Sequence, residues 1–160
     1  MVHSHTTITH ESNGLAVSGN TATSRAMSEA STLSAETAME LFPFGMVFSD
    51  ELVLHCAGRS LQKVAGPFCT GETIAEKFSV LLPENETLNI EWISRVAGTT
   101  FTVLWHRESD VRLRGGFYQL AADTYAFLGS IWMTDPGDLG RFNLTMRDFA
   151  IMDPMLDMLM

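Results

Sequence analysis

The sequence predicts an α+β fold, a five-stranded antiparallel sheet with helices packed on one face. Two short β-rich runs flank a polar turn at residues 49–51, which indicates a hairpin. Several segments with helical spacing of apolar residues follow, and after Gly98 the spacing changes to every second residue. A sheet with one apolar face buries that face against helices, so this order of elements favours two packed layers.

The first half of the chain contains the hairpin and the helices. The expected elements, in chain order, are a helix over 34–41, strands over 45–48 and 52–56, a helix over 59–64, a helix that begins at a cap in 70–73, and a helix over 86–96. In the helix after 70–73, Ile74, Phe78 and Leu81 share one face at helical spacing. Pro83 ends that helix.

Three consecutive strands form the second half, over residues 100–106, 111–120 and 125–133. One face of the first strand carries Phe101, Val103 and Trp105, and the other carries Thr100, Thr102, Leu104 and His106. In the second strand, the pair Gly115 and Gly116 predicts a β-bulge. A hairpin, short helices and then three antiparallel strands are the order of a PAS-like α+β domain.

The 160 residues are enough for one domain with a hydrophobic core. We expect residues 1–35, rich in Ser, Thr, Ala and Gly, to be a disordered tail, because they cannot bury enough surface to offset their ordering entropy. The domain should cover residues 36–153. Asp153 and Pro154 have the form of a helix start, and the helix over 154–160 is so apolar that it needs a partner or a longer chain.

Charge and composition exclude several classes of function. The formal net charge is −9 and the basic residues do not cluster, so nucleic acid is not expected as a partner. No apolar run reaches membrane-spanning length, and no secretory signal is present. Cys56 and Cys69 are too far apart for a CxxC motif, and reduced thiols favour a cytoplasmic protein.

No residue pattern predicts a catalytic, cofactor or metal site. His3, His5 and His10 could bind a metal weakly, but incidental polar residues in a tail explain them better. His55 and His106 lie in strands without a Ser or Cys nucleophile at a diagnostic position. The face that carries Arg112 and Arg114 is either solvated or accepts an anionic partner surface.

Four stretches share the order and spacing of the motifs of one known family. They are Leu-Phe-Pro-Phe at 41–44 with Val-Phe-Ser-Asp-Glu-Leu-Val at 47–53; Ala-Gly-Arg-Ser-Leu at 57–61; Leu-Arg-Gly-Gly-Phe at 113–117; and Phe-Leu-Gly-Ser at 127–130 with Thr-Asp at 134–135, Leu139, Leu-Thr at 144–145, Asp-Phe-Ala at 148–150 and Asp-Pro-Met-Leu-Asp at 153–157. Through them the sequence resembles the heme-NO-binding-associated (H-NOXA) domain, a PAS-like module of soluble guanylate cyclases and of some bacterial kinases and cyclases. Residues 68–99 match only in their apolar pattern.

The resemblance implies a regulatory domain that binds no heme or other cofactor and is not an enzyme. Such a domain pairs subunits, as a homodimer or heterodimer, and connects a heme-NO-sensing domain or protein to a guanylate cyclase or histidine kinase. The first 35 residues are too short to be the heme domain and lack a Tyr-x-Ser-x-Arg motif. We therefore expect the chain to be a fragment, or an orphaned domain, of a larger signal-transduction protein, with a signalling helix that starts at residue 154.

Two functional surfaces are expected. The leading hypothesis, dimerisation and relay, assigns the partner surface to Leu41, Phe42, Phe44, Met155, Leu156 and Leu159. The alternative is a ligand-sensing PAS domain that binds a small apolar molecule between sheet and helices. Its pocket would be lined by Trp92, Phe101, Trp105 and Phe127.

Overall fold

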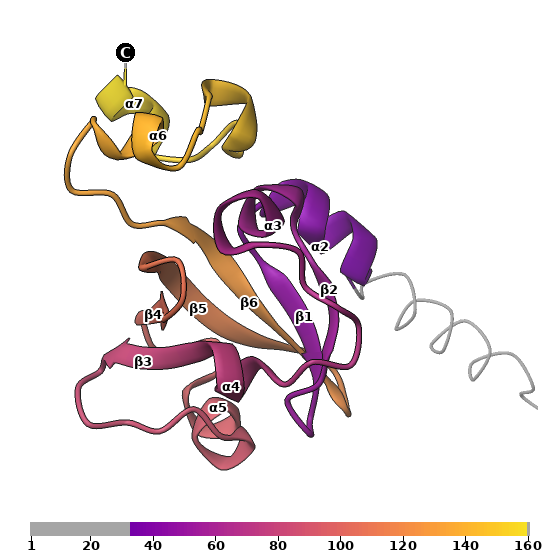
Figure 1. The fold of residues 1–160 in the computed structure, drawn as a ribbon. Coiled ribbons are helices and arrows are strands. Elements are labelled where there is room, and N and C mark those ends of the chain that lie inside the picture. The colour runs from indigo at the N-terminus through magenta and orange to yellow at the C-terminus, as the bar shows by residue number, and fades with distance from the viewer. Residues whose placement is uncertain (1–32, 160) are drawn as a thin grey trace, which may run out of the picture. The chain divides into compact units, whose positions relative to one another are not determined.

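The computed structural model describes the backbone of residues 33–159 and the side chains of residues 33–157. The expected tail over 1–35 thus lies almost entirely outside the described residues. In chain order the elements are α2 (Ala35–Leu41), β1 (Met46–Ser49), β2 (Leu54–Ala57), α3 (Arg59–Ala65), α4 (Ile74–Lys77), β3 (Phe78–Leu82), α5 (Ile90–Val96), β4 (Thr102–His106), β5 (Val111–Ala121), β6 (Thr124–Ile131), α6 (Asp138–Arg141), the 3₁₀ turn η1 (Met146–Asp148) and α7 (Met155–Leu159) (Figure 1). Within this part of the chain, no helix has the length and apolar character needed to cross a membrane.

The strands form one antiparallel sheet in the order β2-β1-β6-β5-β4-β3. The predicted hairpin and the three late strands are all present, but the prediction of five strands is wrong because β3 adds a sixth. Residues 78–82 were expected to continue a helix from Ile74. In the structure the helix ends at Lys77, and Phe78 and Val80 pair with His106 and Leu104 of β4.

The expected helix over residues 74–81 would bury Ile74 and Phe78, and the observed strand arrangement buries the same two residues. Their spacing therefore does not distinguish the helix from the strand. The segment Phe-Ser-Val-Leu-Leu is also suited to a strand, since aromatic and β-branched side chains pack well on a pleated surface. The edge of β4 offers this segment a row of backbone hydrogen-bond partners, which a short helix would leave unused. Tertiary pairing therefore decides between the two structures.

One face of the sheet carries the hydrophobic core. Phe117 pairs with Phe127, and Leu113 with both Leu104 and Ile131, so these buried side chains point to the same side. They pack against the apolar residues of three helices, which are Leu61 and Val64 of α3, Ile74 of α4, and Trp92, Ile93 and Val96 of α5. The helix expected over residues 86–96 is present, but it begins at Ile90 and not at residue 86.

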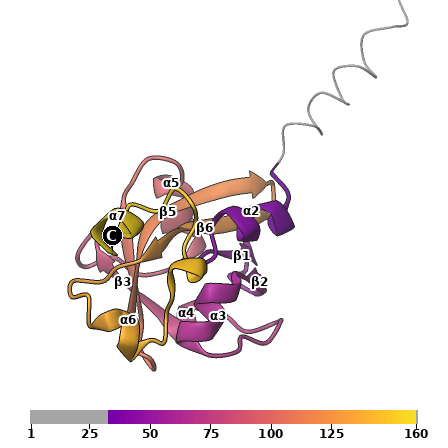
Figure 2. The ribbon, with the colours of Figure 1, turned by 90° about the horizontal axis from the view of Figure 1, so that it is seen from above.

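The second face of the sheet is covered at one end by α2, so helices do not pack on one face alone. Val47 pairs with Cys56 and Ala126, and these three residues point away from the core. Ala35 and Met39 of α2 line a common groove with Cys56, and Val47 and Ala126 are buried. Figure 2 shows α2 and α3 on opposite sides of β1.

The register of β5 and β6 corrects the predicted bulge. The strands pair without interruption through Gly115 and Gly116, and the irregularity lies between Gln119 and Ala121. The glycines have a different role. A Cβ at Gly129 would lie 2.1 Å from the carbonyl oxygen of Arg114, and one at its partner Gly115 would lie 2.2 Å from that of Leu128.

This close approach predicts a sharp difference between two glycines of the same hairpin. Gly129→Ala should lower the free energy of unfolding by about 2 kcal/mol or more, because the added methyl group meets backbone that cannot move alone. Gly116→Ala is the matched control, since its Cβ would have no neighbour closer than 3.5 Å. Urea unfolding of both variants measures the difference, and equal stabilities would contradict this account of the hairpin.

Candidate functional site

An open apolar groove crosses the uncovered part of the second face of the sheet, and we call it the sheet groove. Its residues come from five segments of the chain. They are Glu40 and Leu41 of α2 with Phe42, Phe101 before β4, Arg114, Gly129 and Ser130 of β5 and β6, and residues 150–154. Arg114 pairs with Ser130, which places both side chains on the face opposite the core.

The sheet groove exposes large apolar side chains. Leu41 is 54% exposed and Phe101 is 59% exposed, while Ile151 and Met152 are 93% and 90% exposed. Tyr118, on the same sheet face, is also exposed. Single exposed apolar residues are common on soluble proteins, but a contiguous set of them around a groove is typical of a binding surface.

Asp153 holds the loop that carries Ile151 and Met152. Its carboxylate accepts a hydrogen bond from the Ser130 hydroxyl of β6 and one from the backbone N–H of Met155, at 2.9 Å. Asp153 is buried, so both bonds are shielded from water. Asp153 and Pro154 were predicted to start a helix. Asp153 also connects the start of that helix to strand β6 in the middle of the sheet.

A second set of polar contacts, the α3 latch, fastens the C-terminal segment to α3. The Arg59 guanidinium donates to the carbonyl of Arg147 at 2.8 Å, and the Ser60 hydroxyl donates to that of Asp148 at 2.5 Å. Lys63 forms an ion pair with the Asp148 carboxylate at 2.8 Å, which also accepts from the backbone N–H of Thr145 at 2.7 Å. Burial alone would raise the pKa of Asp148, but the hydrogen bonds from Lys63 and Thr145 outweigh it and hold this pKa below its ordinary value.

The residues expected at the partner surface do not share one environment. Leu41 and Phe42 line the sheet groove, and Leu156 is half-buried against the core. Phe44 and Met155 are buried in the core of the same chain, where the ring of Phe44 packs 5.5 Å from that of Phe149. The bond from Met155 to Asp153 turns the start of α7 inward. The side chain of Leu159 lies outside the described residues.

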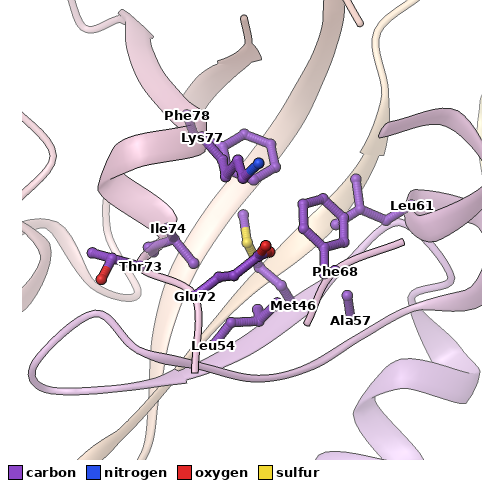
Figure 3. Close-up of a pocket in the computed structure, with 10 residues that line it drawn as sticks. All are labelled: Met46, Leu54, Ala57, Leu61, Phe68, Glu72, Thr73, Ile74, Lys77 and Phe78. Atoms are coloured by element: carbon purple, nitrogen blue, oxygen red, sulfur yellow. The ribbon is translucent and has the colours of Figure 1, made fainter. Parts of the chain in front are cut away.

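The four residues expected to line an apolar pocket are not brought together either. Trp92 and Phe127 are in the core, where both contact Phe117. Phe101 lies in the sheet groove, and Trp105 points to the second face, where its indole N–H donates to Asp110 at 2.9 Å. The space between sheet and helices that Figure 3 shows, lined by Met46, Phe68 and Phe78 among others, has a volume of about 10 Å³. That volume is comparable to one water molecule and too small for an apolar ligand.

The candidate metal and nucleophilic residues remain dispersed. His3, His5 and His10 lie outside the described residues. Among the described ones, no three His, Cys, Asp or Glu side chains are placed to hold a metal ion. Cys56 is half-buried, and burial raises its pKa, which disfavours the reactive thiolate.

His106 is the one buried histidine in the described part of the chain. Its Nδ1 accepts a hydrogen bond from the backbone N–H of Ser109 at 3.2 Å and lies 2.7 Å from the Ser109 hydroxyl, which assigns the proton to Nε2. Nε2 is buried beside the rings of Phe68 and Phe78 and has no hydrogen-bond partner among residues 33–157. Burial lowers the pKa of His106 below its ordinary 6.5; Lys77 and Arg107 lower it further, and Glu108 opposes them.

The neutral state of His106 predicts a dependence of stability on pH. The unfolded chain binds a proton near pH 6.5, and the folded chain binds it only at lower pH. The free energy of unfolding is therefore highest above pH 6.5 and should fall as the pH decreases below it. His106→Asn, which keeps an acceptor near Ser109, should remove this part of the slope in thermal unfolding measured between pH 7.5 and 5. An unchanged slope in the variant would rule out His106 as its source.

Residues 31–112 match the model of the family described as Heme NO binding associated. The match covers about half of the 160 residues, from the segment before α2 to the start of β5. A search among curated proteins finds no match.

Proposed function

The chain belongs to the heme NO binding associated family, and from this premise we propose that it is a non-catalytic domain that pairs subunits and relays signals in a heme-NO signalling protein. The parent protein would be of the guanylate cyclase or histidine kinase type. The family itself is associated with heme-NO sensing, so a heme-NO-sensing domain or protein is the upstream partner that we propose.

We assign the fold to the PAS-like class on the basis of its strand order. Five consecutive strands of the sheet, β2-β1-β6-β5-β4, comprise the predicted hairpin at one side and the three late strands at the other. The helices α3, α4 and α5 lie between these two groups in sequence and pack on the core face. In this assignment β3 is an additional edge strand and α2 is a helix that precedes the PAS-like core.

The exposed apolar side chains of the sheet groove are the observation that carries the pairing proposal. Leu41, Phe101, Ile151 and Met152 gather on one face and remain in contact with water in the isolated chain. Burying such side chains in a partner surface stabilises the complex by about 25 cal/mol per Å² of apolar area, less the cost of association. A face of this kind is what a subunit-pairing domain needs.

The α3 latch and Asp153 provide a route for the relay. Both fasten the segment that leads to α7, one to a helix on the core face and the other to the central strand β6. A change in the position of α3 therefore reaches α7 through a short series of hydrogen bonds, while Asp153 connects α7 to the sheet groove. We propose that signals pass as a shift of this segment, a type of transition that packed elements undergo between discrete positions.

The ligand-sensing alternative has less support. Between sheet and helices, the space lined by Met46, Phe68 and Phe78 has a volume of about 10 Å³, and the four residues proposed for the pocket are divided between the two sides of the sheet. A small apolar molecule would have to bind in the open sheet groove, where most of its surface stays exposed. Ligand sites in proteins bury most of the ligand, so the groove is better suited to a protein surface.

Pairing predicts a measurable association of the purified chain. Sedimentation equilibrium at up to about 100 μM should show a dimer, a range that detects affinities weak enough for a relay. Ile151→Glu should weaken association by about ten-fold or more, because it places a charge on the most exposed apolar residue of the groove. Met146→Glu, an exposed methionine of η1 outside the groove, should leave the affinity unchanged. A monomer at the highest concentration would refute the pairing proposal.

The relay route predicts that the α3 latch restrains the C-terminal segment. Asp148→Ala removes the acceptor shared by Lys63 and Thr145, so it should cost about 1–2 kcal/mol of stability and increase amide hydrogen exchange over residues 149–157. Lys63→Met removes the ion pair and keeps the apolar stem, and should cost less than about 1 kcal/mol. Unchanged hydrogen exchange over residues 149–157 in Asp148→Ala would contradict the prediction that the α3 latch restrains this segment.

A further inference from the structure

We propose that the uptake of a proton by His106 opens the loop over residues 66–70, which we call the Phe68 loop, while the sheet stays folded. The loop is then a pH-sensitive cover over one end of the core, in a part of the molecule that the proposed pairing does not use. Three observations carry the inference. They are the packing of Phe68 on His106, the sparse attachment of the loop, and the buried nitrogen of His106 that has no hydrogen-bond partner among residues 33–157.

Phe68 belongs to a group of three packed rings and is the member that reaches the solvent. Its ring is stacked on that of Phe78, with 6.1 Å between the centroids, and meets the imidazole of His106 edge to face at 5.9 Å. Phe78 and His106 are buried, whereas Phe68 is half-buried. Figure 3 shows the Phe68 ring beside the small space that Met46 and Phe78 also line. Movement of Phe68 is therefore the shortest way to bring water to His106.

The backbone holds the Phe68 loop in place by few contacts. No backbone group of Phe68 forms a hydrogen bond with another described residue. Gly66 begins the loop and Gly71 follows it, with φ angles of 91° and 98°, and a Cβ at either would find no atom within 4 Å. After this point the chain is fixed, because Gly71 and Glu72 form backbone hydrogen bonds with Leu54 of β2. The loop can therefore move between the two glycines while the edge of the sheet stays paired.

A proton on His106 favours the open loop because of the hydrogen bonds of its ring. In the neutral ring, Nδ1 accepts a bond from the backbone N–H of Ser109, and Nε2 has no partner among the described residues. The protonated ring has two N–H donors, so Nδ1 can no longer accept that bond. An unpaired N–H costs more free energy in an apolar site when its ring is charged. Movement of Phe68 lets water accept from Nε2, which removes this cost in the open form alone.

The charged groups near His106 do not take the place of that water. Burial is the main reason that the pKa of His106 lies below its ordinary 6.5; Lys77 and Arg107 also lower this pKa, and Glu108 raises it. The Glu108 carboxylate is paired with Lys77 at 3.3 Å, and the guanidinium of Arg107 donates to two backbone carbonyl groups of α4. Neither charge pattern offers an acceptor to Nε2.

The other elements around His106 add no acceptor either. Its partners in the neighbouring strands, Phe78 and Val111, are uncharged. The Glu72 carboxylate, which lines the space beside Phe68, accepts a hydrogen bond from the backbone N–H of Cys69 at 3.2 Å. The closed form therefore binds the proton only well into the acid range, and the open form binds it nearer pH 6.5. Lowering the pH below 6.5 shifts the equilibrium toward the open loop.

The inference is tested by hydrogen exchange of the full 160-residue chain between pH 7.5 and 5, with each rate divided by the intrinsic rate at that pH. Protection of the Cys69 and Glu72 amides should fall about five-fold or more as the pH decreases, because opening breaks the hydrogen bonds between these two residues. Their exchange should not depend on urea up to about 1 M, since local opening exposes little surface, whereas urea should speed exchange in β5. The same urea dependence at both places would mean global unfolding and would refute the inference.

Two histidine variants locate the group that takes up the proton. His106→Asn should abolish the pH dependence of protection at Cys69 and Glu72. His55→Asn is the matched control, because His55 is an exposed histidine of β2, and this variant should keep the full dependence. A dependence that survives in His106→Asn, or that is lost in His55→Asn, assigns the effect to another group and refutes the inference.

Phe68→Ala tests the cover itself and does not depend on the folding of the His106 variant. Without the ring, water reaches Nε2, so the pKa of His106 should rise toward 6.5. Titration of the imidazole C–H signal by NMR measures this pKa in the original chain and in the variant. Thr70→Ala, at an exposed residue of the same loop, should leave the pKa unchanged. An equal pKa in Phe68→Ala and the original chain would show that Phe68 does not separate His106 from water, which overturns the proposal.

Discussion

The pairing of β5 with β6 is the constraint on which the rest of the structure depends. These are the longest strands of the sheet, and they are hydrogen-bonded from Leu113 and Ile131 to the turn at residues 122–123. Facing glycines let their backbones approach where a Cβ would strike a carbonyl oxygen. Because side chains alternate along a strand, the same hairpin places Phe117 and Phe127 in the core and Arg114 and Ser130 in the sheet groove. The core and the candidate binding surface are therefore two faces of one element and cannot be positioned independently.

The C-terminal segment connects the two faces. Phe149 and Met155 belong to the core, whereas Ile151 and Met152, only a few residues away, are almost fully exposed. The hydrogen bonds of Asp153 to Ser130 and Met155 fix the end of the loop that exposes Ile151 and Met152. The α3 latch fixes the chain just before this loop, at Asp148. Burial of Met155 changes where a partner surface is to be sought. The apolar residues available for docking lie in the loop before α7, beside the end of α2, and not at the buried start of α7 itself.

This arrangement fits the relay function that we propose. The buried polar residues of the described part of the chain, Ser60, Thr102, His106 and Asp153, each form a hydrogen bond with neighbouring backbone or hydroxyl groups, and Nε2 of His106 has no such partner. Protein interiors are closely packed, so a displacement of one element shifts the elements that pack against it. The chain belongs to a family associated with heme NO binding, and in the function that we propose the groove faces a second subunit and the latch faces the output.

The sequence by itself determined the class of fold, the hairpin, the late strands and the family, because alternating apolar residues, turn residues and spaced motifs are local signals. It also suggested Leu41 and Phe42 for a partner surface, whereas Phe101, which was expected in an interior pocket, lies in the sheet groove. Only the tertiary structure decided that residues 78–82 form a strand, since the partner edge of β4 comes from residues more than 20 positions away. Likewise Phe44 and Ile151 look equally apolar in the sequence, yet one is buried by Phe149 and the other is exposed. Which apolar residue remains for a partner depends on what the rest of the chain covers, and that is a property of the packed structure.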